Sequence, residues 1–154
     1  MPLHLPQPRF DLFYRHDALT DLLMDYAHAA PELVRVESIG KSHEGRDIWL
    51  ATLTNTATGA ADDKPAFWID GNIHAAELTA STACLYYLHQ LISHYGSDRA
   101  TTELLNTRTI YICPRLNPDG AELALADAPR HIRSSVRLYP HDEEHVEGLT
   151  IEDI

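Results

Sequence analysis

The sequence predicts an α/β fold, a mixed parallel and antiparallel sheet with helices on both faces. Segments with helical spacing of apolar residues alternate with short apolar segments along the chain. Residues 65–70 are an almost continuous apolar run, which is typical of a strand covered on both faces, and residues 108–117 are predicted to form the next buried strand. Nearer the N-terminus, two strands joined by a glycine-containing turn predict an antiparallel hairpin.

The first predicted elements are an arm, a helix and the hairpin. Residues 1–9 contain three prolines and predict an extended arm. Asp17 is a suitable N-cap, and apolar residues then recur at helical spacing until Pro31 stops the helix. The two strands of the hairpin are predicted over residues 33–39 and 47–53, with the turn GKSHEGR between them.

The next elements alternate strand with helix. The strand PAFWID, residues 65–70, precedes a long helix over about residues 77–95, with Gly96 suited to the position after its end. A shorter helix over residues 101–106 leads to the strand 108–117, which the turn NPDG closes. This order indicates that the loops after the two buried strands lie at one edge of a layered sheet.

Composition argues against two classes of partner. The chain has 12 Lys and Arg against 23 Asp and Glu, a net charge of −11 with neutral histidines, which argues against nucleic acid and anionic membranes. Cys84 and Cys113 stand in apolar surroundings and are predicted to be buried free thiols. The N-terminal residues MPLHLPQPRF lack the apolar stretch of a signal peptide, so a cytoplasmic protein is expected; its oligomeric state stays open.

The most informative stretch is GNIHAAE, which follows the first buried strand. His74 and Glu77 stand three residues apart, and on the first turn of a helix both side chains face the same side. Neutral imidazole and carboxylate are suitable zinc ligands, and the small residues Gly71, Ala75 and Ala76 leave room for an ion and a substrate. The pattern favours two ligands of a zinc site over a solvated pair.

Three further motifs leave alternatives open. NPDG is interpreted as a turn in which the asparagine and the aspartate cap backbone groups. The segment RHIRSSVR contains Arg130, Arg133 and Arg137, which form either a solvated surface or a site that binds a carboxylate or polarises a carbonyl. HDEEH matches an inverted zinc motif, but the nearby proline and glycine disfavour the helix it needs, so His141 and His145 are only outside candidates.

Together, SIGKSHEGRDI, IDGNIHAAELTAS and RLNPDG resemble, in this order and spacing, the zinc carboxypeptidases of the carboxypeptidase A type. The resemblance extends from the first helix to the tail. It implies a mixed sheet between helices, a zinc ion, and removal of C-terminal residues from peptide substrates. His74 and Glu77 would be the first two zinc ligands, and Arg133 would polarise the scissile carbonyl, with Arg130 and Arg137 as unresolved alternatives.

The sequence also departs from this family. Ala76 stands where many members carry a substrate-binding arginine, which argues against digestive-type substrate handling. Residues 1–154 resemble the N-terminal part of the catalytic domain, and residues 128–154 form an irregular tail, so the domain is expected to be incomplete. The third ligand and the general base would lie outside the chain, leaving it inactive alone. A zinc-dependent N-acyl amino acid deacylase and a non-catalytic relative that binds peptide ends are the alternatives.

Overall fold

The structure is a computed structural model that describes residues 4–137. Its strands are β1 (Val34–Lys41), β2 (Asp47–Leu53), β3 (Ala66–Asp70) and β4 (Thr109–Cys113). Its α-helices are α1 (His16–Ala29), α2 (Thr79–His94), α3 (Arg99–Thr107) and α4 (Pro118–Ala124), and two single turns of 3₁₀-helix, η1 (Thr56–Thr58) and η2 (Ala61–Asp63), precede β3.

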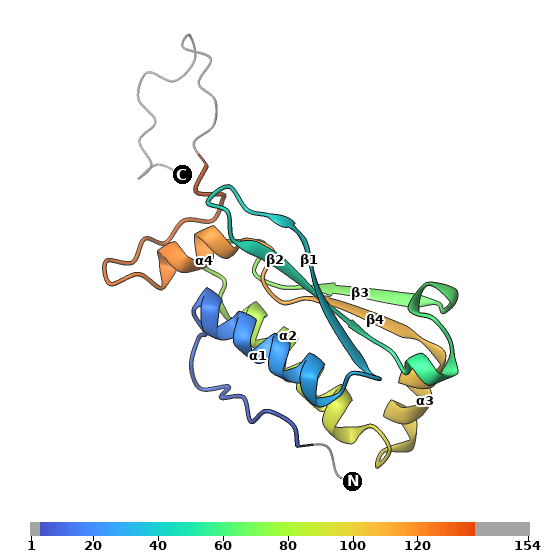
Figure 1. The fold of residues 1–154 in the computed structure, drawn as a ribbon. Coiled ribbons are helices and arrows are strands. Elements are labelled where there is room, and N and C mark those ends of the chain that lie inside the picture. Colours follow the sequence, from blue (N-terminus) through green and yellow to red (C-terminus); the bar gives the residue numbers. More distant parts are fainter. Residues whose placement is uncertain (1–3, 138–154) are drawn as a thin grey trace.

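The four strands form one sheet in the order β1-β2-β4-β3 (Figure 1). The pairs β1/β2 and β2/β4 are antiparallel, whereas β3/β4 is parallel. The central strand β4 therefore sets Ile112 between Ala51 of β2 and Ile69 of β3. This arrangement confirms the predicted mixed sheet with helices, including the hairpin at the start of the chain.

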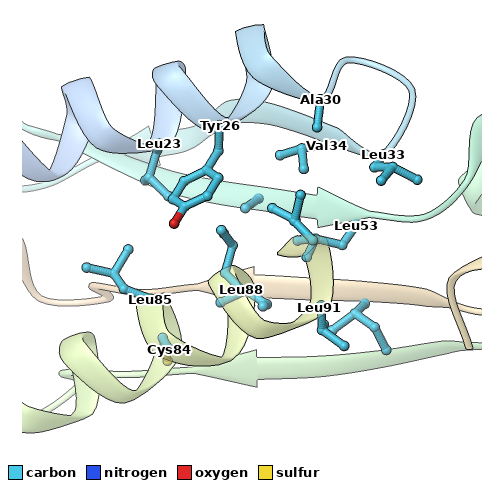
Figure 2. Close-up of a cluster of buried hydrophobic side chains, with 14 of the residues drawn as sticks. Leu23, Tyr26, Ala30, Leu33, Val34, Leu53, Cys84, Leu85, Leu88 and Leu91 are labelled. Atoms are coloured by element: carbon cyan, nitrogen blue, oxygen red, sulfur yellow. The ribbon is translucent and has the colours of Figure 1, made fainter. Parts of the chain in front are cut away.

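One face of the sheet carries the main hydrophobic core. Figure 2 shows Leu23 and Tyr26 of α1 facing Leu85 and Leu88 of α2, with Leu53 of β2 beside them. All five side chains are buried. Full burial of an aliphatic side chain contributes roughly 1.5–3 kcal/mol, so this cluster is the main source of stability for the described residues. Both long helices thus pack on the same face of the sheet.

The strand β3 differs from its prediction as a strand covered on both faces. Phe67 is 63% exposed and Trp68 47% exposed. The physical reason is position: β3 pairs only with β4 and forms an edge of the sheet in the described part of the chain (Figure 1). Within residues 4–137, α1 and α2, which pack together in the main core, cover neither of these two side chains.

Element boundaries differ from the sequence predictions at helix starts. α1 begins at His16 after Arg15, so Asp17 lies in the first turn and is not the N-cap. The motif NPDG opens α4: the Asn117 side chain accepts a hydrogen bond from the Gly120 N–H at 3.0 Å, and proline occupies the first helical position. A capping asparagine followed by proline is a helix start, which takes precedence over the turn interpretation.

Other sequence predictions are confirmed at particular residues. Cys84 and Cys113 are free and buried, and burial raises the pKa of each thiol to about 11. Gly96, with φ of 81°, follows α2 in the left-handed conformation that favours glycine.

Residues 128–137 contain no helix or strand, and the histidines of HDEEH lie outside the described residues. In residues 4–137, no helix has the length and apolar character needed to span a membrane.

Candidate functional site

The candidate site lies where β3 and β4 end. Because these neighbouring strands are parallel, their carboxyl ends reach the same edge of the sheet. The loops that follow continue the pairing: the Leu116 N–H donates to the Gly71 carbonyl at 2.9 Å, and the Asn117 N–H donates to the Asn72 carbonyl at 3.0 Å. The loops containing GNIHAAE and NPDG therefore run side by side.

Asn72 shapes the first of these loops. It is buried and adopts φ of 56°, a left-handed conformation that asparagine tolerates better than most residues. Its side-chain amide donates to the carbonyls of His74 at 2.7 Å and Ala75 at 3.0 Å. These bonds bend the chain into an irregular turn ahead of α2, so His74 and Glu77 precede the helix and do not lie on its first turn.

His74, Glu77 and Arg133 nevertheless converge. The Nδ1 atom of His74 lies 3.0 Å from Oε2 of Glu77, and Nη1 of Arg133 donates to Oε1 of the same carboxylate at 2.6 Å. Hydrogen bonds from His74 and from Arg133 lower the pKa of Glu77, so this carboxylate is ionised at neutral pH. The Glu77 side chain is 52% exposed, which leaves it accessible from solvent.

Two of these groups suit a zinc ion. In a tetrahedral zinc site, nitrogen and oxygen ligands at their usual bond lengths lie about 3.3 Å from each other. The 3.0 Å separation of His74 Nδ1 and Glu77 Oε2 is close to that spacing, so one ion could contact both atoms. Within residues 4–137, no cluster of three or more His, Cys, Asp or Glu side chains could hold a metal ion. His74 and Glu77 therefore fit two of the four coordination positions of a zinc site.

The structure distinguishes the three candidate arginines. Arg133 reaches Glu77 with its guanidinium, and its carbonyl accepts the Ala75 N–H at 3.1 Å. Arg130 is held through its backbone N–H, which donates to the Leu123 carbonyl at 3.2 Å. The backbone N–H of Arg137 donates to a serine hydroxyl at 3.1 Å. Of the three, Arg133 is the one that the fold brings to the histidine and the glutamate.

Asp119 has a role that the sequence did not reveal. It is only 4% exposed, and its carboxylate accepts hydrogen bonds from Ser42 Oγ at 2.6 Å, the Glu44 N–H at 2.9 Å and Arg46 Nη1 at 2.7 Å. Burial alone would raise its pKa, but these three donors outweigh burial and the pKa of Asp119 is below the ordinary value. Asp119 therefore fastens the β1–β2 turn to α4, a contact between residues more than 70 positions apart.

Gly120 fixes the distance between the two motif loops. A Cβ atom at this position would lie 2.3 Å from Cβ of Ala75 and 3.0 Å from its Cα. Ala75 is fully buried, so a side chain at 120 has no free volume. The glycine of NPDG is thus required because α4 packs directly on the loop that contains the candidate ligands.

A cavity of about 310 Å³ opens beside these groups. Its walls include His43 of the β1–β2 turn and two residues of the site, His74 and Arg133. Ser134 and Ser135, which follow Arg133, also line it. A larger cavity of about 450 Å³ lies elsewhere on the sheet, lined by residues such as Leu33, Thr54 and Tyr111, and contains none of the candidate site residues. The smaller cavity is therefore the one that adjoins the candidate site.

Comparisons with known proteins give consistent results. The model of the zinc carboxypeptidase family matches residues 19–143. Carboxypeptidase A2 of Mus musculus is 40% identical over 90 residues, which cover 58% of this chain and 20% of that protein. Carboxypeptidase B of Astacus astacus is 33% identical over 115 residues, which cover 75% of this chain and 36% of the relative.

A solved structure extends the similarity to the fold. The carboxypeptidase A from Helicoverpa armigera superimposes with a TM-score of 0.72 at 28% identity, covering 84% of this chain and 30% of that chain. The present chain thus spans well under half the length of each of these relatives.

Proposed function

The chain belongs to the zinc carboxypeptidase family, and we propose on that premise that the protein is a zinc-dependent carboxypeptidase acting on the C-terminal residues of peptides. The predicted carboxypeptidase-like fold is confirmed by the structural similarity over most of the chain. The observation that carries the proposal is the convergence of His74, Glu77 and Arg133 at the carboxyl ends of two parallel strands.

Each of these residues has a proposed role. His74 and Glu77 are the zinc ligands of this chain; bound zinc supplies a Lewis acid that polarises a carbonyl and acidifies water. The Arg133 guanidinium donates hydrogen bonds to the oxygen of the scissile carbonyl, where negative charge develops during hydrolysis. Its contact with Glu77 supports this role because it holds the guanidinium beside the ligands.

A third ligand and a general base are proposed to come from outside the described residues. The relatives are several times longer than the part of them that this chain matches, which supports this assignment. For residues 1–154 alone we therefore propose weak zinc binding without efficient turnover, since loss of a general base alone typically lowers a rate by ~10²–10⁴.

The alternatives have less support. The named relatives are carboxypeptidases, and none of these comparisons favours an N-acyl amino acid deacylase. The non-catalytic, peptide-end-binding relative differs from the proposal only in turnover. The cytoplasmic location expected from the N-terminal residues stays a prediction.

Mass spectrometry of peptide digests tests the proposal. The zinc-loaded whole protein should shorten a peptide with a free C-terminal carboxylate, one residue at a time. Arg133→Ala should lower kcat/KM by roughly 10²–10³, the usual effect of removing a donor to a developing oxyanion. Arg130→Ala and Arg137→Ala are the matched controls, because Arg130 and Arg137 form hydrogen bonds through their backbone N–H groups. Both should leave kcat/KM near the original value.

Other results would select an alternative. Release of product from N-acyl amino acids but not from peptides would replace the proposal with a deacylase. Stoichiometric zinc binding together with peptide binding, but with no cleavage of any peptide, would indicate a non-catalytic relative.

A further inference from the structure

The β1–β2 turn forms part of the wall of the candidate site. Ser42 and His43 line the same cavity as His74 and Arg133, although they come from a hairpin distant in sequence. In Figure 1 the tip of this hairpin lies beside the start of α4. Three hydrogen bonds to Asp119 hold the tip in place, so the turn is a fixed wall and not a free surface loop.

Within the turn, one side chain is left to face a ligand. Ser42 Oγ donates to Asp119 and accepts the Arg46 N–H at 3.0 Å, so both of its functions are engaged. The Arg46 guanidinium is held by Asp119 and by Glu44. His43 is exposed and lines the cavity, and among residues 4–137 its ring makes no hydrogen bond.

The side-chain oxygens of Asp119 and Asn117, which line the cavity, already accept hydrogen bonds. Both carboxylate oxygens of Asp119 accept hydrogen bonds from the β1–β2 turn. The side-chain oxygen of Asn117 accepts the N–H of Gly120. These oxygens are therefore not free to accept hydrogen bonds from a ligand that offers mainly donors.

Donors, in contrast, remain available. The His43 ring can present an N–H to the cavity, and Arg133 uses one of its guanidinium N–H groups on Glu77 and retains others. The Ser135 oxygen accepts the Arg137 N–H, which leaves its own hydroxyl hydrogen to donate. Three available donors, one of them a guanidinium, are complementary to an anionic acceptor such as a carboxylate.

We propose that this cavity receives a carboxylate-bearing side chain of the peptide substrate, that His43 is the residue that selects it, and that Asp119 is the positioning residue that holds His43 in the wall. The proposal rests on the peptidase function proposed above, because it names the substrate class of that site. The substrates are peptides with glutamate or aspartate beside the residue to be released.

Paired peptides test the preference on the chain itself. N-acetyl-Ala-Glu-Phe and N-acetyl-Ala-Gln-Phe differ in one carboxylate, and their dissociation constants are measured by calorimetry with the zinc-saturated chain. The glutamate peptide should bind roughly tenfold more tightly, the effect of one additional hydrogen bond to a charged group. His43→Ala should abolish this ratio while changing the affinity for the glutamine peptide less than about twofold, since an alanine removes only the selecting donor.

Two variants control for folding and for position. His28→Ala removes another exposed histidine, from the last turn of α1, and should leave the tenfold ratio intact. Asp119→Asn should lower the ratio toward one while zinc affinity stays unchanged, because the ligands do not contact Asp119. A purely structural Asp119 would instead weaken binding of both peptides equally.

The outcomes separate this inference from the proposed function. Equal binding of the two peptides by the original chain, or a ratio that survives His43→Ala, would overturn the inference and leave the peptidase proposal standing. Failure of the zinc-loaded whole protein both to bind and to shorten any peptide would overturn the proposed function and the inference together.

Discussion

Two carboxylates at the same edge of the sheet serve different purposes. Asp119 follows β4, is 4% exposed and accepts three hydrogen bonds from the β1–β2 turn. Glu77 follows β3, has a side chain that is 52% exposed, and contacts His74 and Arg133. The pKa of each carboxylate is below its ordinary value, Asp119 in spite of burial and Glu77 because of its two neighbours.

The difference shows how to tell a structural carboxylate from a functional one. Donors from the protein already occupy both oxygens of Asp119, and replacing any of them would leave a buried polar group without a partner. The partners of Glu77 are exposed, and exposed ion pairs contribute little to stability, so binding an ion between His74 and Glu77 would cost little stability. Burial and saturation therefore give Asp119 the role of holding the β1–β2 turn in place, whereas exposure leaves the Glu77 carboxylate accessible to the zinc ion that we propose.

Removing the buried carboxylate should have the largest effect on stability. Asp119→Ala leaves the Ser42 hydroxyl and the Glu44 N–H without their acceptor and leaves the Arg46 guanidinium only Glu44, so the free energy of unfolding should fall by about 3 kcal/mol. Urea unfolding measures it. Asp11→Ala, which removes an exposed aspartate paired with Arg9, is the matched control and should change the midpoint little. Equal midpoints for the two variants would mean that Asp119 contributes no more to stability than an exposed aspartate does.

Removing the exposed carboxylate should affect metal binding and not stability. Glu77→Gln should weaken zinc binding by roughly 100-fold or more, since loss of even an outer-shell partner costs ~10–100-fold. The urea midpoint of the metal-free protein should stay unchanged. Competition with a chromophoric chelator measures the affinity, and Glu103→Gln, an exposed glutamate on α3, serves as control. If Glu77→Gln lowered the urea midpoint and left zinc affinity intact, Glu77 would be a structural residue.

The smallest effect should appear at acid pH. Because the folded-state pKa of Asp119 lies below the ordinary value of 3.8, the unfolded chain takes up its proton first as pH falls. The stabilisation from this carboxylate is therefore fully present above that value and disappears as pH falls through the folded-state pKa. Urea midpoints measured from pH 6 to pH 2 should show the advantage of the original protein over Asp119→Asn shrinking below about pH 4. A constant advantage across this range would contradict the assignment.

Much of the local structure follows from sequence because local interactions decide it. The helical spacing of leucines in α1 and α2 and the glycine-containing turn after β1 predicted these elements within a few residues of their observed bounds. The start of α4 was the exception: NPDG satisfies the rules for a turn and for a helix start, and the capping bond from Asn117 decides between them.

The pairing of H-A-A-E with N-P-D-G could be predicted only in part. The order of strands and helices predicted that both loops reach one edge of a sheet, which the parallel pairing of β3 with β4 bears out. Neither motif indicates the close contact of Gly120 with Ala75, because this contact depends on how α4 packs against the loop. The same holds for Asp119, whose donors come from a distant hairpin.

By itself, the sequence determined the residue types that can perform chemistry and the segments that carry them: a histidine and a glutamate three residues apart, an arginine-rich segment, and apolar runs that form a mixed sheet. Tertiary structure decided which arginine reaches the glutamate, which carboxylate is buried, and that the β1–β2 turn borders the site. The physical reason is that spacing along the chain controls only contacts within one element. Contacts between elements depend on packing and register, which many distant residues set together.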